Sequence, residues 1–371
     1  MKSRARRSGI ALAEAAHVPG RWLRRGLIVL LPLLAGCDRE AHLKQYPQTT
    51  FAPKSDYARD LDWLFMYVLI LGVAVAVITF GVLAYILVRY RYHPDHPEPE
   101  QTHGNTRLEL TLTAVPAIIL ALIAVPTVRQ IFYTQREAPA NALTVDVIGY
   151  QWWWGFRYAV PGTQDTVVTA NEIHVAVGTP VQLRMTSRDV IHSFWVPQMG
   201  GKRDVIPGRT NTILFTPEEP GVYYGQCAEF CGDSHALMRM RLVAHTREGF
   251  QEWLRNEASP APPPAATDTA VLLGKEIVTR GVCAGCHTVR YGMHPDSTTR
   301  GVTGPNLTHF GRRYSMAGGI MPNTAENLFR WVRDAPSIKP GSKMPQLGGD
   351  APGALTDDQI RYVVAYLQTL Q

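Results

Sequence analysis

The chain has 371 residues, of which 46% are hydrophobic and 18% are charged, and its formal net charge is +6 at pH 7. This length suits two or three domains rather than one, and the apolar composition favours a protein with a membrane part. The 37 basic and 31 acidic residues form no run of five or six like charges, which argues against nucleic-acid binding.

The N-terminal segment has the pattern of an export signal. Basic residues precede a short apolar run, 27–34, which is followed by Ala35, Gly36 and Cys37. The run is too short to cross a bilayer and matches the apolar core of a secretory signal. Its ending resembles the lipobox of bacterial lipoproteins, so we expect residues 1–37 to be a lipoprotein-like signal peptide with Cys37 as the lipidation site. The alternative is a buried, inert cysteine.

Two long apolar stretches follow, at about residues 63–88 and 110–128. Each is long enough to cross a membrane, because about 20 apolar residues suffice. We therefore expect a two-helix transmembrane hairpin within residues 60–135. The connection between the helices carries three arginines and few acids near the helix ends, which by the positive-inside rule places it in the cytoplasm.

Residues 143–246 predict a small antiparallel β-sandwich. Alternating apolar runs occur at 144–148, 181–185 and 212–215, and Pro-Gly turn signals separate the runs at the spacing of a sandwich. A helix flanked by acids is expected next, over residues 248–257.

A linker rich in proline and alanine, residues 258–267, precedes the last domain. Its prolines favour an extended spacer. Over residues 268–371 the apolar spacing is helical, notably at 325–332 and 356–370, and strand-like alternation is scarce. The last domain is therefore expected to be all-α.

The stretch CAEFCGDSHALM, residues 227–238, gathers side chains that suit copper. Thiolate and thioether ligands select copper among the common metals, and imidazole suits it as well. A second histidine precedes the stretch by 35 positions. The candidate ligands are His192, Cys227, Cys231, His235 and Met238.

The second cysteine is informative, because a single-copper cupredoxin site needs only one. With two, both thiolates can bridge a pair of copper ions, an arrangement that favours electron transfer. Two other interpretations remain open from the residues alone. One is a Cys227–Cys231 disulfide in an oxidising compartment; the other is a zinc site, which would leave Met238 without a role.

Residues 60–245 resemble subunit II of the haem-copper cytochrome c oxidases. The matching runs are GYQWWW at 149–154, DVIHSF at 189–194, PGR at 207–209 and the whole CxExCGxxHxxM loop. The resemblance implies a two-helix hairpin followed by a cupredoxin-like domain with a binuclear copper A centre. Quinol oxidases resemble the same fold but lack the copper ligands, all of which are present here.

The resemblance implies roles for three further residues. Glu229 would bind copper through its backbone carbonyl, and its carboxylate would help to bind magnesium at the contact with subunit I. Trp152 matches the tryptophan through which electrons enter from cytochrome c, whereas Trp153 and Trp154 could equally belong to an aromatic belt at the membrane interface. Glu109 matches the acid at the mouth of a proton pathway, although by itself it is a carboxylate at a helix end.

The motif CxxCH at 283–287 is the attachment signature of c-type haem. Cys283 and Cys286 would form thioethers with the haem vinyl groups, and His287 would bind the iron. A methionine as the sixth ligand raises the reduction potential, and Met344 resembles the methionine of class I cytochromes c. The same resemblance implies that the carbonyl of Pro305 accepts the His287 ring N–H.

Other candidates for the sixth ligand are Met293, Met316 and Met321. We expect Met316 and Met321 to be core or loop residues, as methionines usually are. His309 could also bind iron, but we expect it to be a hydrogen-bonded surface residue.

Together these features predict a multidomain membrane protein: a two-helix transmembrane hairpin, a cupredoxin-like β-sandwich and an all-α cytochrome c domain. The whole chain resembles the subunit II of bacterial oxidases that carry a fused cytochrome c. The resemblance implies a place in the bacterial inner membrane, with the copper and haem domains on the periplasmic side. It implies membrane lipid, subunits I and III, and a cytochrome c or another respiratory donor as partners.

The function that the resemblance implies is electron delivery to a proton-pumping terminal oxidase. Electrons would pass through haem c and copper A to the haem of subunit I, where oxygen is reduced, so no catalytic residue is expected in this chain. Two alternatives are the copper A subunit of a nitric oxide reductase and a membrane-anchored electron-transfer protein that is not part of an enzyme.

Overall fold

The computed structural model describes residues 45–92, 94, 97–98, 100–159, 166–263, 265, 267–290, 298–299, 301 and 303–371. The predicted signal peptide, Cys37 and Met293 lie outside the described residues.

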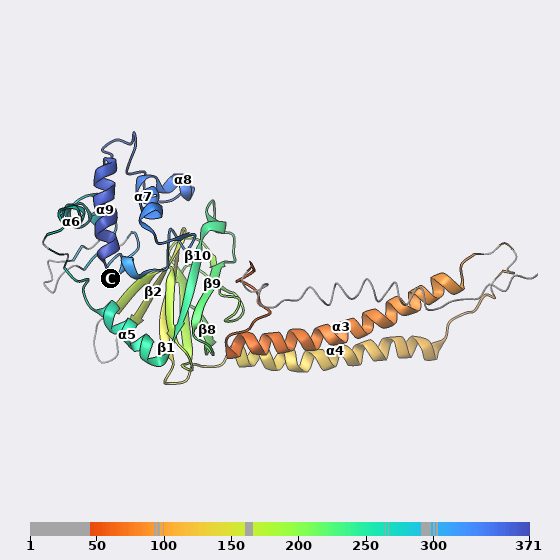
Figure 1. Ribbon diagram of the computed structural model, residues 1–371. Coiled ribbons are helices and arrows are strands. Elements are labelled where there is room, and N and C mark those ends of the chain that lie inside the picture. The colour runs from red at the N-terminus through yellow and green to blue at the C-terminus, as the bar shows by residue number, and fades with distance from the viewer. Residues whose placement is uncertain are drawn as a thin grey trace, which may run out of the picture. The chain divides into compact units, whose positions relative to one another are not determined.

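Two long helices, α3 (Asp56–Arg89) and α4 (Thr106–Thr134), run side by side (Figure 1). Both are long and apolar enough to cross a membrane, and both extend beyond the predicted 63–88 and 110–128. Each begins at a side-chain cap, where Ser55 accepts from the Ala58 amide at 3.1 Å and Asn105 accepts from the Leu108 amide at 3.1 Å. Most of their apolar side chains are exposed, as expected for surfaces that face lipid.

Two five-stranded sheets follow, and together they form a β-sandwich (Figure 1). The first sheet consists, in spatial order, of β3 (Thr166–Ala170), β2 (Trp153–Ala159), β1 (Leu143–Tyr150), β5 (Val181–Ser187) and β8 (Asn211–Phe215). The second consists of β4 (Glu172–Ala176), β10 (Arg239–His245), β9 (Gly221–Cys227), β6 (His192–Trp195) and β7 (Arg203–Val205).

The sandwich is mixed, so the prediction of an antiparallel sandwich is wrong for two strand pairs. Strand β1 pairs with β5 in parallel, and β4 pairs with β10 in parallel. The alternation of apolar residues shows which face of a strand is buried but not the direction of its neighbour. The core between the sheets contains fully buried large side chains, among them Trp154, Phe156, Tyr158, Ile173, Leu183 and Leu242.

Helix α5 (Arg247–Ala258) packs against β3, β4 and β10 of the sandwich and contains the predicted 248–257 segment. Its buried side chains are Phe250, Trp253 and Leu254. Hydrogen bonds hold the segment at the end of this helix. The Arg290 guanidinium donates to the carbonyl oxygens of Glu257, Ala258 and Ser259 at 3.1, 2.9 and 3.2 Å. The start of the predicted linker is therefore held against the last domain.

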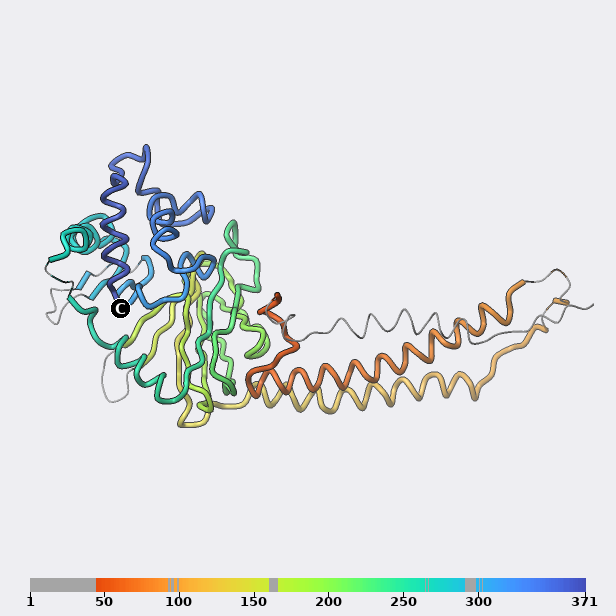
Figure 2. Tube along the Cα trace, in the orientation of Figure 1, coloured from red at the N-terminus to blue at the C-terminus, as the bar shows by residue number. Residues whose placement is uncertain are grey.

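The last domain is helical (Figure 2). Its elements are α6 (Thr269–Arg280), η2 (Val282–Gly285), η4 (Phe310–Arg312), β11 (Ser315–Met316), β12 (Met321–Pro322), α7 (Ala325–Arg333), α8 (Ala335–Ile338) and α9 (Asp357–Thr369). Helices α6 and α9 pack closely, because Gly274 lets the backbone of Tyr362 approach. Within the described residues the strands of this domain are two residues long, so the all-α prediction is confirmed.

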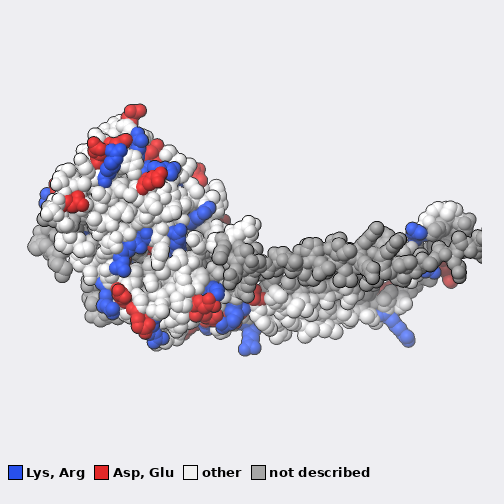
Figure 3. All heavy atoms as spheres, in the orientation of Figure 1, with Lys and Arg blue, Asp and Glu red and all other residues white. Residues whose placement is uncertain are grey.

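Figure 3 shows Lys and Arg interspersed with Asp and Glu on the visible face of the β-sandwich and the helical domain. The visible side chains along the middle of the helix pair are uncharged. The visible surface therefore offers no large patch of one sign.

Candidate metal centres

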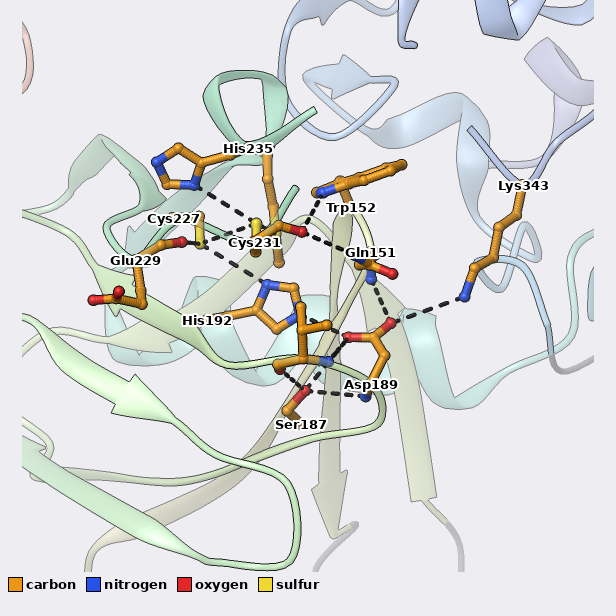
Figure 4. A network of polar contacts seen from close by, with 12 residues as sticks. Gln151, Trp152, Ser187, Asp189, His192, Cys227, Glu229, Cys231, His235 and Lys343 are labelled. Atoms are coloured by element: carbon orange, nitrogen blue, oxygen red, sulfur yellow. Dashed lines mark hydrogen bonds and ion pairs between the residues drawn. The ribbon is translucent and has the colours of Figure 1, made fainter. Parts of the chain in front are cut away.

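Five predicted copper ligands converge at one end of the sandwich (Figure 4). The sulfurs of Cys227 and Cys231 lie 3.8 Å apart. His192 Nδ1 lies 3.9 Å from the first sulfur, and His235 Nδ1 lies 3.6 Å from the second. Met238 Sδ lies 3.9 Å from Cys231 Sγ. Each cysteine sulfur thus has one imidazole nitrogen facing it.

The folding of the second sheet explains this convergence. Cys227 is the last residue of β9, and the antiparallel pairing of β9 with β6 places it opposite Phe194, two residues after His192. The loop then turns back through η1 (His235–Leu237), so that Met238 O accepts from the Cys227 amide at 2.9 Å. Neighbouring strand ends therefore bring together ligands that are 35 positions apart.

A second hydrogen bond orients the His192 ring. Its Nε2 lies 2.8 Å from Asp189 Oδ1, while Asp189 Oδ2 accepts from the Gln151 amide at 2.7 Å. With its N–H directed at the carboxylate, the ring presents the Nδ1 lone pair to Cys227. Gly149 lets the ring fit, because a Cβ there would lie 2.8 Å from His192 Cδ2. The sequence interpretation missed Asp189, although a carboxylate three residues before a ligand histidine was a usable signal.

The two thiols are electrostatically coupled. The hydrogen bond with Cys231 lowers the pKa of Cys227, and the same contact raises the pKa of Cys231. Two adjacent thiolates repel each other unless cations lie between them, and a pair of copper ions would supply those cations.

The donor set fits copper better than the two alternatives. Both cysteines are free, so they form no disulfide in this structure. The Glu229 carbonyl oxygen lies 3.3 Å from Cys227 Sγ, which adds a fourth kind of donor to the two thiolates, two imidazoles and one thioether. A structural zinc ion takes four ligands and does not use a thioether, whereas a pair of copper ions would use the whole set.

The CxxCH segment borders a cavity in the helical domain that is lined by Cys283, Cys286, His287, Met316 and Met344. His287 Nδ1 lies 2.7 Å from the Pro305 carbonyl oxygen, which confirms the predicted contact. Because a carbonyl can only accept, Nδ1 donates and Nε2 is free to bind iron. Burial lowers the pKa of His287, which also favours the neutral ring.

Glycines shape the surroundings of this histidine. A Cβ at Gly304 would lie 2.6 Å from the His287 ring, and one at Gly301 would lie 2.3 Å from the backbone of Cys286. The cavity and the oriented imidazole both fit a covalently attached haem.

The described candidates for the sixth ligand differ in whether they line the cavity. Met344 and Met316 both line the cavity. Met316 is therefore a stronger alternative to Met344 as the sixth iron ligand than its predicted role as a core residue implied. Met316 is nevertheless buried, with 3% of its surface exposed. His309 is also 3% exposed, so the prediction of a surface histidine is wrong. Its ring nitrogens face the carbonyl oxygens of Gln371 and Ser259, each at 2.9 Å, because the C-terminus folds over it.

The copper domain contributes to the haem cavity. Trp152 and Trp153 line the cavity together with residues of the helical domain. The buried Glu172 carboxylate of β4 also reaches that domain, where it accepts from the Ser315 amide at 2.8 Å and from the Ser315 hydroxyl at 3.0 Å. Burial raises the pKa of Glu172, and the nearby Arg313 guanidinium opposes that shift.

Comparison with known proteins agrees with this architecture. Residues 45–129 match the family "Cytochrome C oxidase subunit II, transmembrane domain", residues 160–245 match "Cytochrome C oxidase subunit II, periplasmic domain", and residues 271–371 match "Cytochrome c". A cytochrome c oxidase subunit 2 of Alkalihalophilus pseudofirmus is 34% identical over 352 residues, which cover 93% of this chain and 96% of that protein.

The chain belongs to the cytochrome c oxidase subunit II family. The cytochrome c oxidase subunit 2 of Bacillus subtilis is 31% identical over 362 residues, which cover 93% of this chain and 96% of that protein. Quinol oxidase subunit 2 of Bacillus cereus is 30% identical over 240 residues, 63% of this chain and 78% of that protein. Overall similarity therefore extends to both classes of oxidase.

Membership carries several conclusions. The chain is a membrane-anchored component of a haem-copper oxidase, has subunit I as its partner and receives electrons from a donor of the cytochrome c type. The subunit II domain implies copper A, and the fused cytochrome c domain implies haem.

The three tryptophans of this subunit II have different environments. Trp152 is 8% exposed and donates its Nε1–H to the Cys231 carbonyl oxygen at 2.9 Å. Trp153 stacks on Tyr150 with ring centroids 4.2 Å apart. Trp154 is fully buried and packs edge-on against His192, so the aromatic-belt interpretation is wrong for Trp154.

Two carboxylates predicted to act outside the copper site are exposed. The Glu229 side chain points away from the two sulfurs (Figure 4). Glu109 lies in the first turn of α4, where Oε1 accepts from the Asn105 amide at 3.3 Å. Both are accessible to a neighbouring subunit.

Proposed function

We propose that this subunit delivers electrons to a proton-pumping terminal oxidase through its own haem c and copper A centre. Cytochrome c or another respiratory donor gives electrons to the haem domain, and the copper pair gives them to the haem of subunit I, where oxygen is reduced to water. The bound haem and copper supply the one-electron redox chemistry. The chain supplies the ligands, the path between them and the membrane anchor.

One observation supports the internal path above all others: Trp152 belongs to both sites. Its side chain lines the haem cavity, and its indole N–H is bound to the backbone carbonyl of Cys231. A short covalent and hydrogen-bonded route therefore leads from the haem cavity to a copper ligand. This geometry favours Trp152 as the residue through which electrons enter the copper centre.

The proposed copper ligands are His192, Cys227, Cys231, His235 and Met238, with the Glu229 carbonyl as the sixth. The proposed haem ligands are His287 and Met344, and Cys283 and Cys286 attach the haem. The exposed Glu229 carboxylate is proposed to share a magnesium ion with subunit I.

The membrane part is proposed to be a hairpin in the bacterial inner membrane whose connection faces the cytoplasm. The copper and haem domains then face the periplasm, and Glu109 lies at the cytoplasmic end of α4, where a proton pathway can begin. Subunit III is a proposed partner, and lipidation at Cys37 is a proposed second anchor.

Oxygen uptake by the purified complex, measured with and without added cytochrome c, tests this function together with copper and haem quantification. We expect two copper ions and one haem c per chain, and uptake that the complex sustains with an artificial reductant. Cys231→Ala should lose both copper ions and keep the haem. A normal binuclear copper spectrum in Cys231→Ala would contradict the ligand assignment, and reduction of nitric oxide instead of oxygen would contradict the proposed acceptor.

A further inference from the structure

A buried lysine lies at the boundary between the haem cavity and the copper loop. Lys339, which follows α8, is 4% exposed and lines the same cavity as His287. Its Nζ donates to the Trp152 carbonyl oxygen at 2.5 Å and to the Leu237 carbonyl oxygen at 3.0 Å. Leu237 directly precedes the proposed copper ligand Met238. One side chain of the haem domain therefore binds both copper-domain segments that border the electron path.

The hydrogen bonding around Lys339 matches an ammonium group. A third bond goes to the Ala317 carbonyl oxygen at 3.0 Å, so the three N–H groups of an ammonium meet three acceptors, whereas a neutral amine has only two N–H groups. Burial lowers the pKa of Lys339 to about 7, and the Cys231 thiolate opposes that shift. The three carbonyl oxygens also favour the charged form.

The backbone around Nζ is shaped to hold it. Ala317 has a φ of 56° and Gly318 a φ of 80°; left-handed backbone is costly for alanine. A Cβ at Gly318 would lie 2.3 Å from Lys339 Nζ, so only glycine leaves room for the ammonium. Strained backbone of this kind is retained where the surrounding contacts require it.

The two residues after Lys339 extend the contact. The buried Ser234 hydroxyl of the copper loop donates to the Pro340 carbonyl oxygen at 2.6 Å. Gly341 lies directly on the Trp152 ring, because a Cβ there would be 2.6 Å from the ring edge. The Lys339–Gly341 segment thus contacts the indole, the backbone of the same tryptophan and the copper loop.

We propose that Lys339 is a positioning residue for electron transfer between the haem and copper centres, because its ammonium holds Trp152, the copper loop and the wall of the haem cavity in one arrangement. The inference rests on the proposed internal electron path. In the step itself ferrous haem loses one electron and the oxidised copper pair gains it, with no bond made or broken. Lys339 acts on the geometry of that step and, through its charge, on the potential of the copper pair.

The test uses the complete oxidase complex and three variants. Lys339→Met keeps most of the side-chain length but removes the donors and the charge. Lys202→Met is the matched control, because Lys202 is exposed in the copper domain and makes no contact in the haem cavity. Gly341→Ala separates the segment from the Trp152 ring while the ammonium is kept. Copper and haem content are measured first.

Three measurements follow: the rate of copper reduction by photoreduced haem c, the reduction potential of the copper pair, and amide exchange in peptides 234–239 and 315–320. In Lys339→Met we expect a rate about tenfold lower, the factor that corresponds to about 1.4 kcal/mol, and faster exchange in both peptides. The copper potential should fall, because a nearby cation favours the reduced state. Gly341→Ala should slow the transfer with little change in potential, and Lys202→Met should match the wild type.

A wild-type rate and wild-type exchange in Lys339→Met, with both metals present, would overturn the inference. If that variant does not assemble, Gly341→Ala decides: slower transfer supports the proposed contact, and an unchanged rate refutes it. Failure of the proposed function has a different signature, since wild-type protein would then lack haem or copper or would show no electron transfer between them.

Discussion

Replacement of Gly274 by alanine should destabilise the haem domain, although alanine is the better helix former. A Cβ at this position would lie 1.9 Å from the Tyr362 carbonyl oxygen and 2.9 Å from Tyr366 Cβ. The nearest atom belongs to the backbone of α9, so α6 and α9 must move apart. Their separation would loosen buried side chains such as Val278 and Leu367.

The magnitude follows from two opposing effects. Alanine gains about 1 kcal/mol over glycine inside a helix. Overpacking costs about 1–3 kcal/mol, and a clash between two backbones belongs at the upper end of that range. The net loss for Gly274→Ala is therefore about 2 kcal/mol, which lowers the midpoint of thermal unfolding by roughly 10 °C for a domain of this size.

Circular dichroism of the haem in the purified complex, followed during heating, measures that midpoint. Gly249→Ala in α5 is the control, because a Cβ there meets only side chains, the nearest being Thr246 Oγ1 at 3.3 Å. Its midpoint should stay the same or rise. A midpoint for Gly274→Ala at or above that of the wild type would show that the packing of α6 against α9 does not require a glycine at this position.

Three further predictions concern the haem domain. Met344→Ala should abolish the weak near-infrared methionine-to-iron band and Met316→Ala should keep it; the reverse result would reassign the ligand. Burial raises the pKa of Glu172. The contribution of Glu172 to the docking of the haem domain on the sandwich is therefore fully present below the ordinary glutamate pKa, and it is lost as the pH rises through the raised pKa. Exchange at Ser315, corrected for intrinsic rates, should therefore increase with pH, and a Glu172→Gln variant with the same pH dependence would contradict this assignment. Thr356→Ala removes the cap of α9 and should cost about 1 kcal/mol in urea unfolding, whereas an unchanged midpoint would show that the capping box contributes nothing.

The fold class was predictable because each domain has its own periodicity. Uninterrupted apolar stretches predicted α3 and α4, alternation predicted β1, β5 and β8, and helical spacing predicted α7 and α9. The parallel pairing of β1 with β5 was not predictable, because alternation carries no information about strand direction.

The candidate site was predictable as a set of ligands but not as an arrangement. The residue types at 227–238 and His192 indicate copper by their chemistry, whereas the Asp189 contact and the Lys339 contact depend on tertiary structure. Lys339 in particular has no local signal, because its three acceptors come from segments at 152, 237 and 317.

The position of Gly341 on the Trp152 ring has a consequence for competition between electron carriers. Trp152 is 8% exposed, so on the proposed electron path a free cytochrome that needs this indole must first displace the haem domain. That domain is attached to the same chain, and its local concentration does not fall when the complex is diluted. On that proposed path a soluble carrier therefore gives its electron to the haem domain rather than directly to the copper domain, and the order of the carriers is set by connectivity rather than by their abundance.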